Sequence, residues 1–180
     1  MDRKPVELDY RIGLVAEYVR KTREAIDSVC ANTPASGLSY HEAVFAVIKL
    51  LADCKQAGSQ VFLVGNGGSA AICSELAARL VKFAKLRAVT FNDFVSMAGM
   101  ANDFGWSQVF AEPLRIHAQA GDILIAISSS GQSPNIHEAV KVTRELDCRV
   151  VTLTGFAPDN PLCAMGDFNF HVNSTSYRHV

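Results

Sequence analysis

The chain has 180 residues, of which 49% are hydrophobic and 19% charged, and its net charge at pH 7 is −1. That length suits one domain with a complete core, and the balanced charge argues against binding to nucleic acid or to anionic membranes. No apolar run approaches the length of a membrane span, and the charged N-terminal segment lacks the apolar region of a signal peptide. We therefore expect a cytoplasmic protein with no nucleic-acid or membrane partner.

Cysteine and histidine are scattered along this sequence. The five cysteines (Cys30, Cys54, Cys73, Cys148 and Cys163) and the five histidines show no CxxC, HxH or HExxH spacing. Most of the cysteines lie within apolar patterns, which is typical of small buried residues in a reducing compartment. Spacing therefore predicts no metal site.

Two helices are predicted before the first strand. Apolar residues at helical spacing predict a helix over about 8–31, followed by a break at 32–37. Ser39 and Glu42 have the spacing of a capping box, which predicts the start of a second helix. That helix runs to about Gln56, and Gly58 ends it.

Strand-like and helix-like runs alternate from residue 60 onward. The predicted strands are Gln60–Val64, Arg87–Phe91, Ile123–Ile127, Arg149–Thr154 and Phe168–Val172. Between them we expect helices over about 69–85, 94–101, 106–119 and 134–146, a turn at 102–105 and a short helix within 155–166. Strands that are apolar throughout belong to a sheet covered on both faces, and the alternation implies parallel order. The predicted fold is therefore α/β: a doubly wound five-stranded parallel sheet with N-terminal helices.

Two loops rich in glycine and serine carry the chemistry. Gly65-Asn66-Gly67-Gly68-Ser69 follows the first predicted strand, and Ser128-Ser129-Ser130-Gly131-Gln132-Ser133 follows the third. Glycine lets the backbone approach a ligand closely, the next helix offers unpaired N–H groups and a positive dipole end, and serine hydroxyls add uncharged donors. This combination suits a phosphate monoester. The loops lack a Walker A lysine and the G-x-G-x-x-G spacing, so no nucleoside triphosphate or dinucleotide site is indicated.

The loops and their surroundings resemble the sugar isomerase (SIS) domain family, and within it the phosphoheptose isomerases. The matching segments cover most of the chain: Leu63–Ala71, Asp93, Ala101–Gly105, Val109-Phe110, Gly121–Leu124, Ser128–Asn135 and Leu153–Gly155. The resemblance implies a flavodoxin-like sheet and a phosphorylated-sugar site in a homotetramer. It also implies that the phosphate is held by Ser69, Ser128, Ser129, Ser130 and Ser133, with Gly67 in the first loop, and that Asn66 and Asp93 contact the sugar.

The resemblance also suggests that two segments of the single domain have different roles. Residues 1–57 would be a helical oligomerisation segment, and 58–180 the α/β sandwich. A tetramer explains the broad apolar faces of the N-terminal helices, although ordinary core packing explains them equally well at this stage. The sequence ends straight after a predicted strand, so we expect either that the chain is truncated or that partner subunits cover one face of the sheet.

The sequence departs from the family on the helix after the first loop. The family pattern is about Gln-His-x-Ala-x-Glu, and here its catalytic glutamate falls on Arg79, while its histidine, a zinc ligand in some members, falls on Glu75. Arginine cannot act as a general base at neutral pH. The zinc-ligand pattern of the family is not matched here, so we expect no cofactor, although zinc occurs in some members and metal use stays open. Near the C-terminus only Arg178 matches the family segment that carries a catalytic histidine.

Three interpretations stay open. In the first, the chain is an aldose–ketose isomerase of the sedoheptulose 7-phosphate isomerase type, and Glu75, one helical turn from Arg79, supplies the carboxylate. In the second, it binds a phosphosugar without turnover, as a regulator or scaffold of the replication-initiator-associating type. In the third, it isomerises another phosphosugar. Glu75 and Arg79 could equally form an exposed ion pair with no chemical role.

Overall fold

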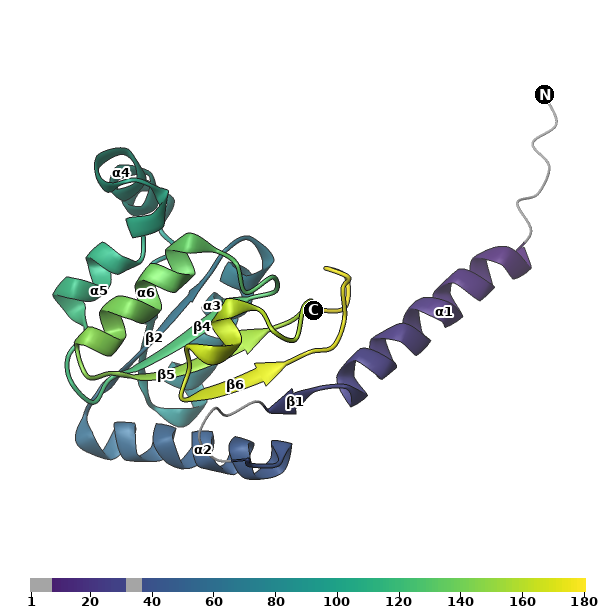
Figure 1. Ribbon diagram of the computed structural model, residues 1–180, viewed down its shortest axis with the longest axis horizontal. Helices are drawn as coiled ribbons and strands as arrows, with labels where there is room; N and C mark the ends of the chain where they lie inside the picture. Colours follow the sequence, from purple (N-terminus) through teal and green to yellow (C-terminus); the bar gives the residue numbers. More distant parts are fainter. Residues whose placement is uncertain (1–7, 32–36) are drawn as a thin grey trace.

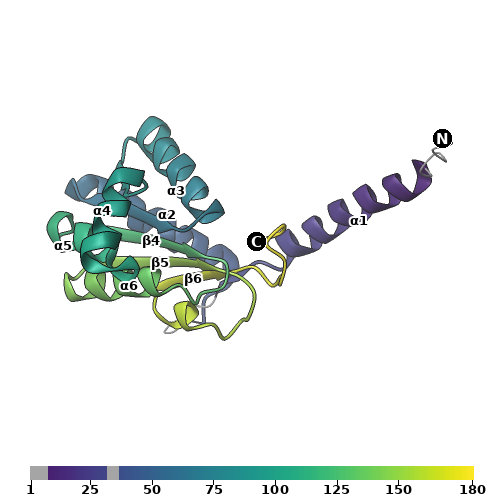
Figure 2. The same ribbon diagram turned by 90° about the horizontal axis from the view of Figure 1, so that it is seen from above.

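The computed structural model describes residues 8–31 and 37–180. It shows one sheet with helices on both faces and a long first helix that extends away from the body (Figures 1 and 2). The strands are β1 (Cys30–Ala31), β2 (Gln60–Gly65), β3 (Arg87–Thr90), β4 (Ile123–Ser128), β5 (Arg149–Thr154) and β6 (Phe168–His171). The α-helices are α1 (Leu8–Asp27), α2 (Tyr40–Ala57), α3 (Gly68–Arg79), α4 (Phe94–Phe104), α5 (Ala111–His117) and α6 (Pro134–Glu145). Three short helical segments are η1 (Leu80–Ala84), η2 (Trp106–Gln108) and η3 (Pro161–Ala164).

The strand order is β1-β6-β5-β4-β2-β3. Strands β2 to β6 are parallel, and all five end within one residue of their predicted bounds. Numbered along the chain, these five have the flavodoxin-like order 2-1-3-4-5. The order reverses between β2 and β4, so the carboxyl ends of these two strands mark the expected ligand crevice.

The strands are apolar throughout because their side chains enter two cores. On one face Phe62, Leu124 and Val150 pack with residues of α5 and α6. On the other face Leu63 and Ile125 pack with residues of α2 and α3. A sheet buried on both sides presents its strand ends, and the loops that follow them, as its accessible edge.

The first helix ends earlier than predicted, and a sixth strand replaces its last turn. Helix α1 stops at Asp27, and Cys30 pairs with His171 so that β1 runs antiparallel to β6. The predicted helix over 8–31 was therefore wrong beyond Asp27, because a pairing partner about 140 residues away leaves no mark on local periodicity. The break predicted at 32–37 lies outside the described residues except for Gly37.

The predicted capping box is confirmed. The Glu42 backbone N–H donates to Ser39 Oγ at 3.4 Å, and the Ser39 backbone N–H donates to Glu42 Oε2 at 2.8 Å. Helix α2 ends at Ala57, and its C-cap Gly58 has φ +71°, as the prediction that Gly58 ends this helix requires.

Three other predicted elements differ from the structure. The helix after the first loop changes into a π-helical turn at η1, where the Lys85 N–H donates to the Leu80 carbonyl five residues earlier. The turn expected at 102–105 is the end of α4, with Gly105 at φ +84°. The helix expected over 106–119 is split into η2 and α5, because Pro113 has no N–H and is accommodated in a first helical turn.

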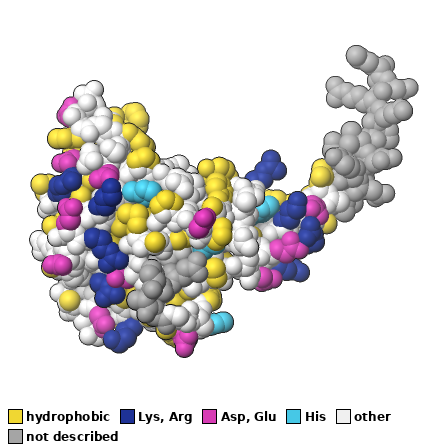
Figure 3. All heavy atoms as spheres, in the orientation of Figure 1, with side chains coloured by type: hydrophobic (Ala, Val, Ile, Leu, Met, Phe, Trp, Pro, Cys, Tyr) yellow, Lys and Arg dark blue, Asp and Glu magenta, His cyan; other side chains and the backbone are white. Residues whose placement is uncertain are grey.

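Helix α1 presents an exposed apolar stripe. Leu14, Tyr18 and Val19 are each about half exposed, and Val15 and Ile26 about two thirds. Basic and acidic side chains lie side by side along the same helix, and both signs are interspersed over the face seen in Figure 3. Within the described ranges, none of the helices combines the length and apolarity that a membrane crossing requires.

Candidate active site

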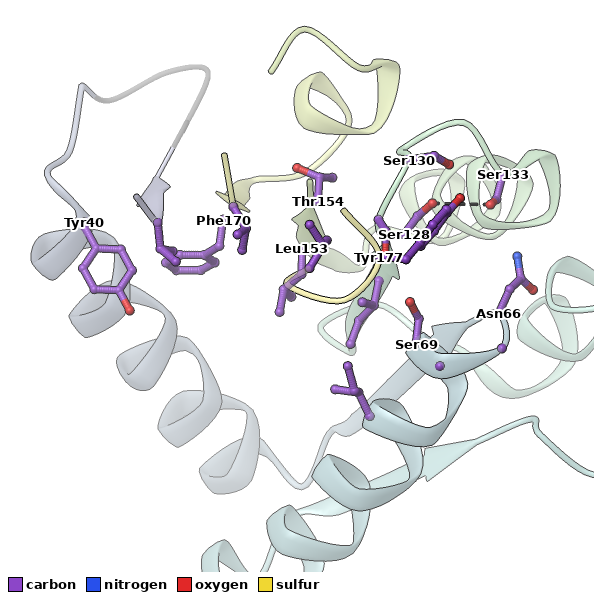
Figure 4. A pocket seen from close by; sticks show the side chains of 18 residues that line it. Tyr40, Asn66, Ser69, Ser128, Ser130, Ser133, Leu153, Thr154, Phe170 and Tyr177 are labelled. Atoms are coloured by element: carbon purple, nitrogen blue, oxygen red, sulfur yellow. Dashed lines mark hydrogen bonds between the residues drawn. The ribbon is translucent and has the colours of Figure 1, made fainter. Parts of the chain in front are cut away.

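A cavity of about 690 Å³ lies at the carboxyl ends of β2 and β4, at the switch point of the sheet (Figure 4). One part of its wall is polar and comes from the two predicted loops. Another part is apolar and comes from α2, α3 and the ends of β5 and β6. The size falls within the range of roughly 300–1,000 Å³ that is usual for small-molecule sites.

Most of the predicted binding residues line this cavity. They are Asn66, Gly67, Ser69, Ser128, Ser129, Ser130 and Ser133. Two loops that lie about 60 residues apart in the sequence thus form one surface, as their positions at the ends of parallel strands predict. The other two predicted residues, Asp93 and Glu75, are not among the residues that line the cavity.

The first loop needs its glycines to turn from β2 into α3. A Cβ on Gly65 would lie 2.8 Å from the backbone carbon of Ser69, which is too close for any side chain. Gly67 has φ +53°, a conformation that L-residues with a side chain seldom adopt, and it precedes the first residue of α3. No side chain caps the N-terminus of α3. The Ser69 and Ala70 N–H groups donate to the backbone carbonyls of Asn66 and Gly67 at 3.0 Å, so the positive end of the helix has no anionic side chain at its cap.

The serine loop is held by its own hydroxyls and by α6. Ser128 Oγ accepts a hydrogen bond from the Gly131 N–H at 3.2 Å and lies 3.3 Å from Ser133 Oγ. His137 Nε2, on the first turns of α6, lies 2.8 Å from the Gly131 carbonyl oxygen. The loop therefore keeps one shape in which several hydroxyls face the same space (Figure 4).

Helix α6 also begins without a side-chain cap. Pro134 occupies its first turn, and Ser133 at the N-cap position makes no capping hydrogen bond. Two helices of 12 residues each thus begin at the polar wall of the cavity with their positive ends unneutralised. Together with the hydroxyls, they make this wall suited to a phosphate dianion.

Asp93 lies at the N-terminus of a different helix and has a partner there. Its carboxylate accepts hydrogen bonds from the backbone N–H of Ser96 at 2.8 Å and from Ser96 Oγ at 2.9 Å, as the N-cap of α4. These hydrogen bonds hold the pKa of Asp93 below its usual range. Its contact with the sugar remains a prediction.

Glu75 forms an exposed ion pair. Its Oε1 lies 2.7 Å from Arg79 Nε, and both side chains are 65% exposed. Gly68 and Ile72, which line the cavity, lie on the same stripe of α3 as Glu75, since residues three and four apart are neighbours on a helix. The carboxylate is therefore one turn beyond the cavity wall. Its catalytic role remains a prediction.

Several lining residues were not predicted as site residues. Thr154 ends β5 as Ser128 ends β4, so a polar residue at a strand end could have indicated it. Its Oγ1 lies 3.1 Å from Nδ1 of the buried His171. Tyr40, Phe170 and Tyr177 carry no sequence signal, because their place in the wall follows from how α2, β6 and the C-terminal segment pack.

Acid–base and metal-binding groups are sparse around the cavity. Of the described residues that line it, none is Asp, Glu, His, Lys or Arg. Across residues 8–31 and 37–180, no cluster of three or more His, Cys, Asp and Glu side chains is arranged to hold a metal ion. The described side chains therefore do not fit the zinc site found in some members of the resembled family.

The profile of one protein family, described as the SIS domain, matches residues 18–155. The chain belongs to the SIS domain family. Its curated relatives include the phosphoheptose isomerase of Geobacter sp. (strain M21), which is 35% identical over 119 residues. That alignment covers 63% of this chain and 62% of the relative, so the chain spans less than two thirds of the relative's length. The phosphoheptose isomerase of Neisseria gonorrhoeae (strain NCCP11945) is 36% identical over 135 residues, which cover 72% of this chain and 68% of the relative.

Solved structures of SIS proteins share the whole fold. The phosphoheptose isomerase from Neisseria gonorrhoeae superimposes with a TM-score of 0.80 at 30% identity, covering 96% of this chain and 89% of that one. A phosphoheptose isomerase from Francisella tularensis gives a TM-score of 0.77 at 25% identity, covering 97% and 89%. The predicted fold class and family are therefore confirmed.

Proposed function

We propose that this SIS protein is an aldose–ketose isomerase of a phosphorylated sugar, of the sedoheptulose 7-phosphate isomerase type. The observation that carries the proposal is the polar wall of the cavity, where two uncapped helix N-termini and the serine hydroxyls converge. The names of the curated relatives support the same reaction. A phosphosugar also fits the volume of the cavity, about 690 Å³.

The reaction moves one carbon-bound proton and one oxygen-bound proton. From the ketose, a base removes a proton from C1 while the C2 carbonyl oxygen is protonated, which gives an enediol. Return of a proton to C2 and loss of the O1 proton then give the aldose. The serine loops anchor the phosphate throughout, and Asn66, which lines the cavity, orients a sugar hydroxyl.

Glu75 is the proposed base. Its carboxylate lies on the helical stripe that carries Gly68 and Ile72 into the cavity wall. To act, it must leave Arg79, and an exposed ion pair of this kind stabilises a protein by only about 0–1 kcal/mol. The release is therefore energetically modest.

The chain is further proposed to work in the cytoplasm as a homo-oligomer, with four copies as the expected number. The exposed apolar stripe of α1, which extends away from the body, supports self-association (Figures 1 and 2). Light scattering on the full chain measures the number of copies.

Proton–deuterium exchange tests the isomerase. Sedoheptulose 7-phosphate is incubated with the protein in D₂O, and deuterium at C1 is followed by NMR while binding is measured by calorimetry. Exchange at C1 with formation of the aldose is the expected result. Tight binding without exchange would instead identify a phosphosugar-binding regulator, or an isomerase of another sugar.

A further inference from the structure

The side chains of Asn66 and Asn135 join the two loops that form the polar wall. Asn66 Nδ2 donates to Asn135 Oδ1 at 3.0 Å, and Asn135 Nδ2 donates back to Asn66 Oδ1 at 2.9 Å. Asn66 lines the cavity, whereas Asn135 is fully buried and is not among the lining residues. The pair is thus a reciprocal bridge between an accessible residue and a hidden one.

The bridge ties together the starts of two helices. Asn66 immediately precedes Gly67, the N-cap of α3, and Asn135 is the second residue of α6. The positive ends of both helices meet at this place, and like partial charges repel each other when no anion is bound. Two neutral amides hold the helix ends together without adding a negative charge, which would compete with a phosphate.

The bridge also fixes which atoms of Asn66 face the cavity. A carboxamide has two N–H donors and two acceptor lone pairs, and the bridge uses one of each on Asn66. One N–H and one lone pair therefore remain for a ligand. Rotating the amide by 180° would place donor against donor and acceptor against acceptor, so the buried Asn135 keeps Asn66 in one orientation.

We propose that Asn135 is a positioning residue, which sets the spacing of the two phosphate loops and the orientation of the Asn66 amide without touching the ligand. The inference rests on the proposed function, because it concerns the same phosphate site. It assigns a binding role to a side chain that lies behind the cavity wall.

A double-mutant cycle tests this role. Affinity for inorganic phosphate and for sedoheptulose 7-phosphate is measured by calorimetry in the wild type, Asn66→Ala, Asn135→Ala and the double variant. We expect Asn135→Ala to weaken phosphate binding about tenfold, and the double variant to bind no more weakly than Asn66→Ala alone. In turnover, KM for the sugar phosphate should rise more than kcat falls.

Thr143→Val is the matched control. Thr143 is also fully buried on α6, but its hydroxyl donates only to the carbonyls of Ala139 and Val140 on the same helix. This variant should lose stability and keep the wild-type affinity for phosphate. If Asn135→Ala behaves in the same way as Thr143→Val, the positioning role is refuted.

Asn135→Asp keeps the test informative if the alanine variant does not fold. An ionised aspartate still accepts from Asn66 Nδ2, but it cannot donate back, and its charge opposes a bound phosphate. A protonated aspartate restores the donor. The affinity of Asn135→Asp relative to the wild type should therefore recover as the pH falls, and a constant ratio would contradict the proposal. If the wild type itself binds neither phosphate nor sugar phosphate, the proposed function fails, whatever these variants do.

Discussion

Glu75 Oε1 and Arg79 Nε lie 2.7 Å apart on the outer side of α3, in an ion pair whose two side chains are 65% exposed. Arg79 occupies the position at which the resembled family has its catalytic glutamate, so the pair places a carboxylate one helical turn before the expected one. The proposed base, Glu75, is thus paired with Arg79 in this structure.

Glu75→Gln should abolish deuterium exchange at C1 while leaving the affinity for sedoheptulose 7-phosphate unchanged. Glutamine cannot accept the carbon-bound proton, and a lost general base lowers the rate by about 10²- to 10⁴-fold. Affinity should be retained because the proposed phosphate contacts come from the serine residues that line the cavity and are unchanged in this variant. Exchange by NMR and binding by calorimetry report the two properties separately.

Arg79→Gln is the control for that variant. It breaks the same ion pair but keeps the carboxylate, so exchange should continue. If both variants exchange at the wild-type rate, Glu75 has no catalytic role and the ion pair is only a surface feature.

Ser130→Ala combined with Ser133→Ala should weaken phosphosugar binding by more than tenfold and leave the fold intact. Both residues line the cavity, and removing two hydroxyl donors removes two hydrogen bonds to a charged group, each about 1.5–3 kcal/mol. Calorimetry measures the affinity, and circular dichroism checks the fold. Ser74→Ala removes a hydroxyl that donates to the Ala70 carbonyl and accepts from Asn92 Nδ2, and none of these three residues lines the cavity, so this variant should bind normally. Unchanged affinity in the double variant would show that this loop does not bind the phosphate.

Gly131→Ala should unfold or strongly destabilise the serine loop. A Cβ on Gly131, which has φ +61°, would lie 1.8 Å from Asn160 Oδ1, and Asn160 is itself fixed by hydrogen bonds to Ala157 and Cys163. Strained backbone conformations cost about 1–3 kcal/mol even before such a clash. Denaturant unfolding measures the loss.

Gly99→Ala is the control for Gly131→Ala, and it should change the free energy of unfolding in the opposite direction. Gly99 lies within α4 with nothing within 4 Å of an added Cβ, so alanine should raise the free energy of unfolding by about 0.5–1 kcal/mol. Equal effects of the two substitutions would show that the Asn160 contact does not constrain the loop.

The buried His171 should make stability depend on pH. Burial lowers the pKa of His171 below its ordinary value. Below about pH 6.5 the His171 imidazole is protonated in the unfolded chain but stays neutral in the folded chain. The free energy of unfolding should therefore fall as the pH drops through this region. His171→Gln should flatten this step below about pH 6.5, as followed by urea unfolding at each pH. A step of wild-type size in this variant would assign the pH dependence to other groups.

Local sequence patterns predicted much of this fold. The apolar run Ile123–Ile127 and the Ser39–Glu42 capping box depend on residues close in the chain, and both lie where they were expected. The two loops were expected to meet, because parallel strands of this topology end at the same edge. The strand at Cys30 could not be predicted from local patterns, since its pairing with His171 depends on the position of a strand far along the chain.

The candidate site was predictable where it follows strand ends, and less so elsewhere. Ser69 and Ser128 line the cavity, as a loop after a strand suggests. Tyr40 and Tyr177 reach it only through the packing of distant segments. The sequence did not show that Asp93 would serve α4 as a cap, because a polar residue before a helix can face either a ligand or its own backbone.

The contrast between α4 and the two helices that begin at the polar wall, α3 and α6, has a consequence for the lifetime of the protein. Helix α4 carries its own anion in Asp93, whereas α3 and α6 begin without a side-chain cap. A phosphosugar bound as proposed would supply the missing anion at these two helix ends, and ligand at 100 times its Kd would add about 2.7 kcal/mol to the free energy of unfolding. The abundance of the protein in a cell would then follow the supply of its substrate, because unliganded copies unfold more often and are degraded sooner.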